Sequence, residues 1–310
     1  MKIFFKEFYP LTKNEFKSLW KRCIFVFDAS FLLDLYEYSE KAAKEVLNLL
    51  KKLKKEGRIW IPYQFAFEYQ KERLSTIKKL QNSCDKALGV IDSLSQQKCL
   101  ELSGKIQLVK DEIEKRKKFY IGLFNKDKFR DNLTDIFNNK VGKKITDDNK
   151  IKKALENGEK RKIDIKEHYG DLVGWCEITE YAKSNKKPII FITSEKKDAW
   201  WWILYDKTTI GPRYELRKDI IDEANVLFHI YRTKNFLDNA EKYLKQKISK
   251  DVVSEVEEIN KKRLEEEIEV SPASSPISGM QESTGNLNPS QIQTIENEDV
   301  GESDSSQNKK

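Results

Sequence analysis

The sequence is poor in the residues that build zinc sites and disulfide frameworks. Its 310 residues include two histidines, His168 and His229, and four cysteines, Cys23, Cys84, Cys99 and Cys176. The histidines are too few and too far apart to nominate a zinc site, and the cysteines form no CxxC pair. We therefore expect reduced thiols in a cytoplasmic protein.

Long apolar runs are also missing. No stretch approaches the roughly 18 consecutive apolar residues of a transmembrane helix. The first ten residues, MKIFFKEFYP, alternate charge with aromatics and do not form the apolar segment of a signal peptide. We expect a soluble protein with no membrane partner.

Charge of both signs is abundant but unevenly distributed. The chain has 58 Lys and Arg against 51 Asp and Glu, for a net charge of +7, whereas residues 271–310 carry six acidic residues and two lysines. A basic body favours a polyanionic partner, because lysine and arginine release phosphate counterions on binding. Solvation of a lysine-rich surface explains the same composition equally well.

Short apolar runs alternate with helical patterns along the chain. Residues 23–28, 58–62, 189–193 and 225–231 predict buried parallel strands, and residues 42–53, 63–80, 170–184 and 236–246 predict helices. This alternation predicts an α/β fold with a doubly wound central parallel sheet flanked by helices.

The remaining segments predict additions to that sheet. Residues 75–162 contain no proline and few strand-forming residues, which indicates a helical insertion. We expect this insertion to form a helical hairpin. We expect one domain over 1–247, a charged helical extension over 248–270 and a disordered acidic tail over 271–310. The tryptophans after Asp198 are expected to begin a short packed helix, with burial in the core favoured over stacking on bases.

Four acids are placed to meet at one edge of the predicted sheet. Asp28 closes the first strand, and Glu195 stands two residues after Thr193 at the end of another. Glu68 and Asp171 lie near helix starts, which would bring them toward the same edge. Four converging carboxylates need a divalent cation, and Mg²⁺ or Mn²⁺ suits oxygen ligands and activates water against phosphodiesters.

Each acid also has a structural interpretation. Asp171 would cap its helix, and Glu68 would pair with Lys71 or Arg73 on a solvated face. Asp28 is harder to explain in this way, because it ends an apolar strand. A phosphatase with an aspartyl nucleophile would need a second Asp where Ser30 stands, which argues against that enzyme class.

Six segments share a family pattern, in register along the chain. They read FVFDASFLLDLY, IWIPYQFAFEYQKER, NLTDIFNNKVGKKIT, HYGDLVGWCEITEYA, IIFITSEKKDAWWW and GPRYEL. From about Cys23 to Leu244 the sequence resembles PIN-like nuclease domains of the prokaryotic subgroup that carries a long helical insertion. The resemblance implies a metal-dependent nuclease fold, usually RNA-cleaving and often found in toxin or anti-phage settings.

Carried over residue by residue, the resemblance implies a ligand set. Asp28, Glu68 and Asp171 match the first three acids, while Thr193 and Glu195 match the strand-end threonine and the fourth acid. The substrate-binding candidates are Ser30, Arg73, Thr193, Lys196, Lys197 and Arg213. Structural ion pairs with Glu72 and Glu215 are equally good explanations for the two arginines.

The sequence departs from the family pattern after the strand-end threonine. Ala199 stands where the family has an acid, and Glu195 stands where the family has the shorter Asp. Either Glu195 or Asp198 is therefore the fourth ligand. A proline- and glycine-rich segment is also replaced by RKIDIKEHYGDL, with Asp164 as the remnant acid.

We expect a Mg²⁺- or Mn²⁺-dependent nuclease that favours RNA over DNA. The alternative is a decayed module that binds nucleic acid or a partner protein, and the insertion is a further candidate surface for a protein partner.

Overall fold

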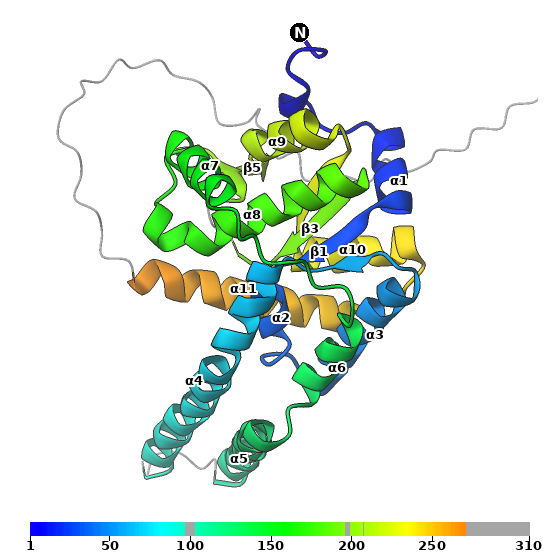
Figure 1. Ribbon diagram of the computed structural model, residues 1–310. Helices are drawn as coiled ribbons and strands as arrows, with labels where there is room; N and C mark the ends of the chain where they lie inside the picture. Colours follow the sequence, from blue (N-terminus) through cyan, green and yellow to red (C-terminus); the bar gives the residue numbers. More distant parts are fainter. Residues whose placement is uncertain (97–102, 196–198, 207, 271–310) are drawn as a thin grey trace, which may run out of the picture.

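A parallel sheet lies at the centre of the computed structural model, which describes residues 1–96, 103–195, 199–206 and 208–270 (Figure 1). Its order is β2-β1-β3-β6, with every neighbouring pair parallel. The strands are β1 (Ile24–Phe27), β2 (Ile59–Trp60), β3 (Ile189–Thr193) and β6 (Phe228–Arg232). The predicted doubly wound sheet is confirmed, and its strand order reverses between β1 and β3.

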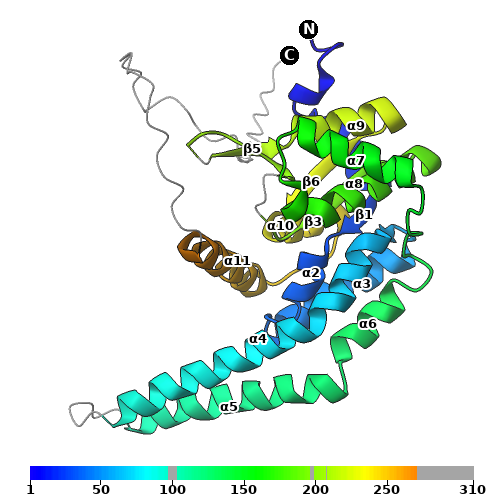
Figure 2. The same cartoon turned by 60° about the vertical axis from the view of Figure 1, so that its left-hand side comes forward.

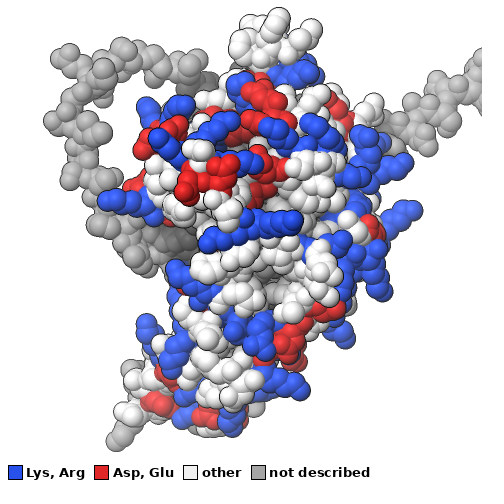
Figure 3. All heavy atoms as spheres, in the orientation of Figure 1, with Lys and Arg blue, Asp and Glu red and all other residues white. Residues whose placement is uncertain are grey.

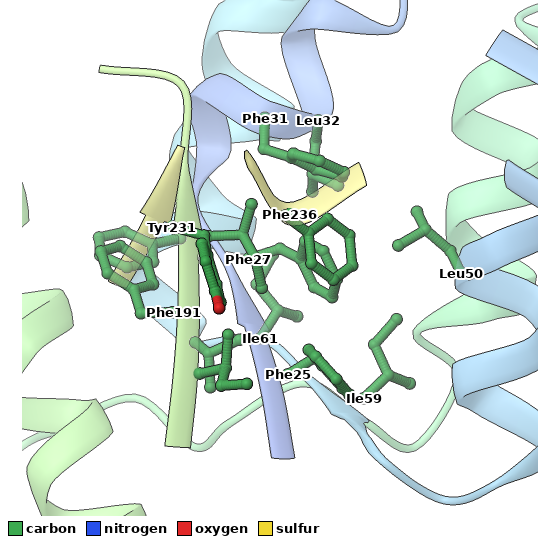
Figure 4. Packing of buried hydrophobic residues seen from close by; sticks show 14 of the residues in the cluster. Phe25, Phe27, Phe31, Leu32, Leu50, Ile59, Ile61, Phe191, Tyr231 and Phe236 are labelled. Carbon is green, nitrogen blue, oxygen red and sulfur yellow. The ribbon is translucent and has the colours of Figure 1, made fainter. Parts of the chain in front are cut away.

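Helices cover both faces of this sheet. Phe236 of α10 packs on Phe25 and Phe27 of β1 on one face (Figure 4). On the other face, Phe65 of α4 packs on Phe191 of β3. One layer contains α1 (Lys13–Arg22), α3 (Glu40–Lys55) and α10 (Thr233–Leu244), and the other contains the start of α4 (Tyr63–Ser95), α8 (Ile165–Asn185) and α9 (Tyr214–Ala224).

Local sequence explains α3 well. Ser39 caps its first turn by accepting a hydrogen bond from the Ala42 amide, and its apolar residues all fall on the buried face. The helix ends just before Gly57, whose φ of 66° suits glycine. The predicted helix over 42–53 and its stop signal are confirmed.

The insertion forms the expected helical hairpin. Helix α4 runs without a break from Tyr63 to Ser95, and α5 (Ser103–Asn125) returns alongside it. The pair projects from the body of the molecule (Figure 2). Two further helices, α6 (Lys128–Ile136) and α7 (Asp148–Lys160), lead back to the sheet. Since α4 begins against β3, the hairpin and the core share one helix.

Smaller elements complete the described fold. They are η1 (Lys6–Phe8), α2 (Ala29–Asp34), the antiparallel pair β4 (Trp201–Ile203) and β5 (Thr209–Pro212), and α11 (Lys250–Val270). Helix α11 buries Val252 and Val256, and its Glu255 carboxylate accepts hydrogen bonds from the backbone amide and the hydroxyl of Ser39. Cys99 and the predicted disordered tail, 271–310, lie outside the described residues. In the described part of the chain, no helix is both long and apolar enough to cross a membrane.

The tryptophan segment departs from the expected short helix. Residues Trp201–Ile203 form strand β4, so that prediction is wrong. Trp200 is 1% exposed and packs against Phe65 and Phe191, and Trp201 is also buried. Burial in the core, rather than stacking on bases, is therefore the role of both side chains.

Candidate active site

A cleft of about 450 Å³ opens at the carboxyl edge of the sheet, between α2, α4 and the start of α8. The four candidate acids Asp28, Glu68, Asp171 and Glu195 all line it, together with Ser30. The residues converge from segments separated by more than a hundred positions in the sequence. The rest of the lining comprises Ala29, Leu33, Asp34, Glu37, Lys71, Glu72, Thr76, Lys79, Glu167 and Gly170.

Asp28 is held rigidly at the strand switch point. It caps the N-terminus of α2, with Oδ1 accepting a hydrogen bond from the Ala29 amide at 2.7 Å. Oδ2 accepts from the Ser30 hydroxyl at 2.9 Å and the Thr193 hydroxyl at 2.7 Å. Because Thr193 ends β3, this carboxylate also ties the ends of β1 and β3 together.

Strand β3 fixes the backbone of Glu195. Its amide donates to the Thr193 hydroxyl at 3.2 Å, and its carbonyl accepts from the Trp201 indole at 2.8 Å. Thr193 itself is fully buried. The buried tryptophan therefore positions the segment that delivers Glu195 to the cleft.

Glu68 meets α8 at a glycine. A Cβ on Gly170 would lie 1.8 Å from Glu68 Oε1, so any side chain there would displace the carboxylate. One turn later, a Cβ on Gly174 would lie 2.2 Å from the Phe65 ring. These two glycines let α4 and α8 approach closely. Gln64 adds a hydrogen bond of 2.7 Å to Glu68 Oε1.

Asp171 is held by a buried histidine. His168 Nδ1 lies 2.8 Å from Asp171 Oδ2, and both residues are buried. At His168 the backbone leaves helical geometry, with φ −112° and ψ 18°, so the first turn of α8 is kinked there. The contact orients the Asp171 carboxylate within the cleft, as a hydrogen-bonding neighbour does for a metal ligand.

Glu177 anchors the start of α4 on α8. It accepts a hydrogen bond from the Gln64 amide at 2.9 Å, which satisfies a donor at the N-terminus of α4. Burial raises the pKa of this carboxyl, while the backbone amides oppose that effect. Glu177 thereby fixes where Glu68 stands relative to Asp171.

The donor set suits a hard divalent cation. Asp28, Glu68, Asp171 and Glu195 offer carboxylate oxygens in one cleft, which is the ligand chemistry of Mg²⁺ or Mn²⁺. Gly170 supports this fit, because its missing side chain makes room for the Glu68 carboxylate. Within the described ranges, however, no three such side chains are arranged closely enough to hold an ion.

The other sequence candidates lie in different settings. Thr193 bonds to Asp28, as described above. Arg73 pairs with the buried Asp127 at 2.8 Å, and Arg213 pairs with Glu215 at 3.0 Å. Neither arginine lines the cleft. Lys196, Lys197 and Asp198 lie outside the described residues.

Sequence reasoning missed several residues of the cleft. Its further acids are Asp34, Glu37, Glu72 and Glu167, and its cations are Lys71 and Lys79. Helical spacing from Glu68 was a usable signal for Glu72 and Lys79, which follow it by four and eleven positions on one face of α4. His168 stands three residues before Asp171, a spacing that also places two side chains on one helix face.

Comparison with known proteins supports one family. Searches of curated proteins and of solved structures find no match to this chain. A family model described as a PIN-like domain matches residues 24–118 and 91–216, which together span more than half of the sequence. The matched range contains Asp28, Glu68, Asp171 and Glu195. The chain therefore belongs to the PIN-like domain family, whose fold is of the nuclease type.

Proposed function

We propose that this protein is a Mg²⁺- or Mn²⁺-dependent nuclease that hydrolyses phosphodiester bonds, with RNA as the favoured substrate. The observation that carries the proposal is the convergence of Asp28, Glu68, Asp171 and Glu195 on one cleft at the strand switch point. Membership in the PIN-like family supports the same chemistry, because PIN-like domains are generally nucleases. A role as a toxin or anti-phage effector is part of this proposal.

The chain's own residues prepare the cleft for this reaction. Asp28, Glu68, Asp171 and Glu195 would hold the cation, which when bound supplies a Lewis acid and an activated water. Hydrogen bonds from the Ser30 and Thr193 hydroxyls fix the orientation of the Asp28 carboxylate. His168 and Gln64 orient Asp171 and Glu68. Repulsion among the acids makes the cleft selective for cations.

The decisive experiment is cleavage of end-labelled single-stranded RNA and DNA by the purified protein with Mn²⁺, Mg²⁺ or a chelator. Wild type should cut only with metal, and Asp28→Asn should lower the rate by more than about 100-fold, because even residues behind metal ligands are worth 10–100-fold. Mn²⁺ should also raise the melting temperature of wild type but not of Asp28→Asn.

Asp222→Asn is the matched control. Asp222 lies on α9, outside the cleft, in an exposed pair with Lys218 at 2.7 Å, so removing its charge should leave cleavage unchanged. Nucleic-acid binding without metal-dependent cleavage by wild type would contradict the nuclease proposal. That outcome would instead support the alternative of a decayed binding module.

A protein partner at the insertion is a further part of the proposal. Near the far end of the hairpin, α4 exposes Val90 and Leu94, and α5 exposes Leu108 and Val109. Exposed apolar side chains at this end of the hairpin support a protein contact. Loss of a co-purifying partner in Leu108→Ser, with cleavage retained, would test it.

A further inference from the structure

We propose that the outer face of α4 is the surface along which a nucleic-acid strand leaves the active site, with Phe67 stacking on a base and Lys71 and Lys79 contacting phosphates. This inference rests on the proposed nuclease function and adds to it the path of the substrate. It follows from the charge, the aromatic exposure and the spacing of residues along one helix.

Charge changes sign along the α4 wall of the cleft. At the sheet edge the wall begins with Glu68, beside the other three candidate ligands. Further out it presents Lys71, Thr76 and Lys79, and these two lysines are the cations of the lining. Lys71 pairs with Glu72 at 3.5 Å, which offsets the acid nearest to it. On the face of the molecule seen in Figure 3, lysines, arginines and acids are interspersed.

Exposed aromatic rings flank the same wall. Phe67 is 51% exposed and stacks on Tyr63, with ring centroids 6.4 Å apart and an interplanar angle of 8°. It precedes Glu68 in α4, and Tyr169, which is 45% exposed, precedes Gly170 in α8. The residues just before Glu68 and Gly170 in the sequence are therefore both exposed aromatics, beside the cleft rather than in its lining. Proteins that bind single strands combine such rings with positive grooves.

The spacing fits a strand of several nucleotides. Lys79 lies eleven positions after Glu68, which is about 16 Å along a helix. At the roughly 3.4 Å per nucleotide of a stacked strand, Lys79 meets the phosphate about five nucleotides from the reacting one. Lys79 and its neighbour Lys78 are both exposed, but only Lys79 lines the cleft.

This pair of adjacent lysines provides the matched test. Cleavage efficiency should be measured against salt for wild type, Lys79→Gln and Lys78→Gln, with single-stranded substrates extended by two to ten nucleotides on either side of the cut. Lys79→Gln should lower efficiency roughly two- to fivefold, as expected for an exposed ion pair. It should also reduce the logarithmic salt slope by about 0.7, the value for one phosphate contact to a single strand.

Substrate length gives the sharper readout. Wild type should gain efficiency when one side of the substrate exceeds about five nucleotides, whereas Lys79→Gln should treat long and short substrates alike. Equal behaviour of Lys79→Gln and Lys78→Gln would overturn the proposed path while leaving the nuclease function intact. Absence of metal-dependent cleavage by wild type would overturn both.

The aromatic contact has its own matched pair. Phe67→Ala should weaken binding by at least about fivefold, since base stacking on an aromatic ring is lost. Leu74→Ala is the control, because Leu74 is 45% exposed two turns further along α4 and has no aromatic ring. Both side chains are exposed, so both variants should fold. A similar effect of the two substitutions would contradict the role of Phe67.

Discussion

The two ends of α4 differ in how tightly they pack against the rest of the protein. Its first turns are pressed against α8, where Phe65 is fully buried and Glu68 meets Gly170. Its last turns leave the body of the molecule (Figures 1 and 2). Val90 and Leu94 in these turns are exposed. At the base, tight packing fixes the position of a carboxylate. Toward the tip, few contacts constrain the sequence, so changes there should alter surface properties more than the site.

Gly170→Ala should have the largest effect, because it changes the contact between α8 and the first turns of α4. The new methyl group would displace the Glu68 carboxylate, so metal-dependent cleavage should fall by more than about 100-fold, beyond the loss typical of residues behind metal ligands. The protein should still fold, because alanine favours a helix by about 0.5–1 kcal/mol over glycine. Cleavage rates and melting curves check this.

Gly174→Ala is the informative counterpart, since its methyl group would meet the rigid, buried ring of Phe65. We expect a loss of about 1–3 kcal/mol of unfolding free energy from overpacking. Equal effects of both substitutions on stability would contradict a specific role for Gly170.

His168→Leu should have the next largest effect. Without the hydrogen bond to Asp171 Oδ2, affinity for Mn²⁺ should fall about 10–100-fold, measured by titration calorimetry and by the metal-induced shift in melting temperature. His168→Asn places an amide nitrogen close to the position of Nδ1 and should restore much of the affinity. Equal metal affinity in the Leu and Asn variants would show that His168 acts only through packing.

His229 provides a comparison on the edge strand β6, away from the cleft. Its ring packs edge-on against Phe16 and Tyr231 on the sheet. Burial, aided by the charge of Arg217, lowers the pKa of His229 from 6.5 to about 3. The unfolded chain therefore binds a proton between these values that the folded chain does not. The stability contributed by neutral His229 is present above pH 6.5 and is lost as the pH falls, at up to about 1.4 kcal/mol per pH unit.

Urea unfolding of wild type and His229→Phe between pH 7.5 and 5 measures this contribution. The variant should lose less unfolding free energy than wild type over the interval. Parallel pH profiles for the two proteins would contradict the assignment to His229.

Leu108→Ser, at the far end of the hairpin, should have the smallest effect. Leu108 is 71% exposed, so its replacement should change the unfolding free energy by no more than about 0.5 kcal/mol and leave cleavage by the isolated protein unchanged. A loss of several kcal/mol would show that the tip belongs to the core.

Sequence patterns predicted the sheet and its acids because both depend on local signals. Apolar runs located β1, β3 and β6, and Asp28 follows β1 directly. Strand β4 was missed because Trp201–Ile203 is short and carries no alternation of polar and apolar residues. The roles of Gly170 and His168 were also missed. Gly170 acts on Glu68, about a hundred positions away, and no local pattern encodes that distance.

Arg116 of α5 holds the other wall of the cleft. Its Nη2 donates to the carbonyl oxygens of Tyr36, Glu37 and Tyr38, in the loop that follows α2 and contributes Glu37 to the lining. One helix of the hairpin, α4, thus carries Glu68, and the other, α5, holds the loop that contributes Glu37 to the opposite wall. Because α4 and α5 pack against each other, the two walls of the cleft are joined through the hairpin.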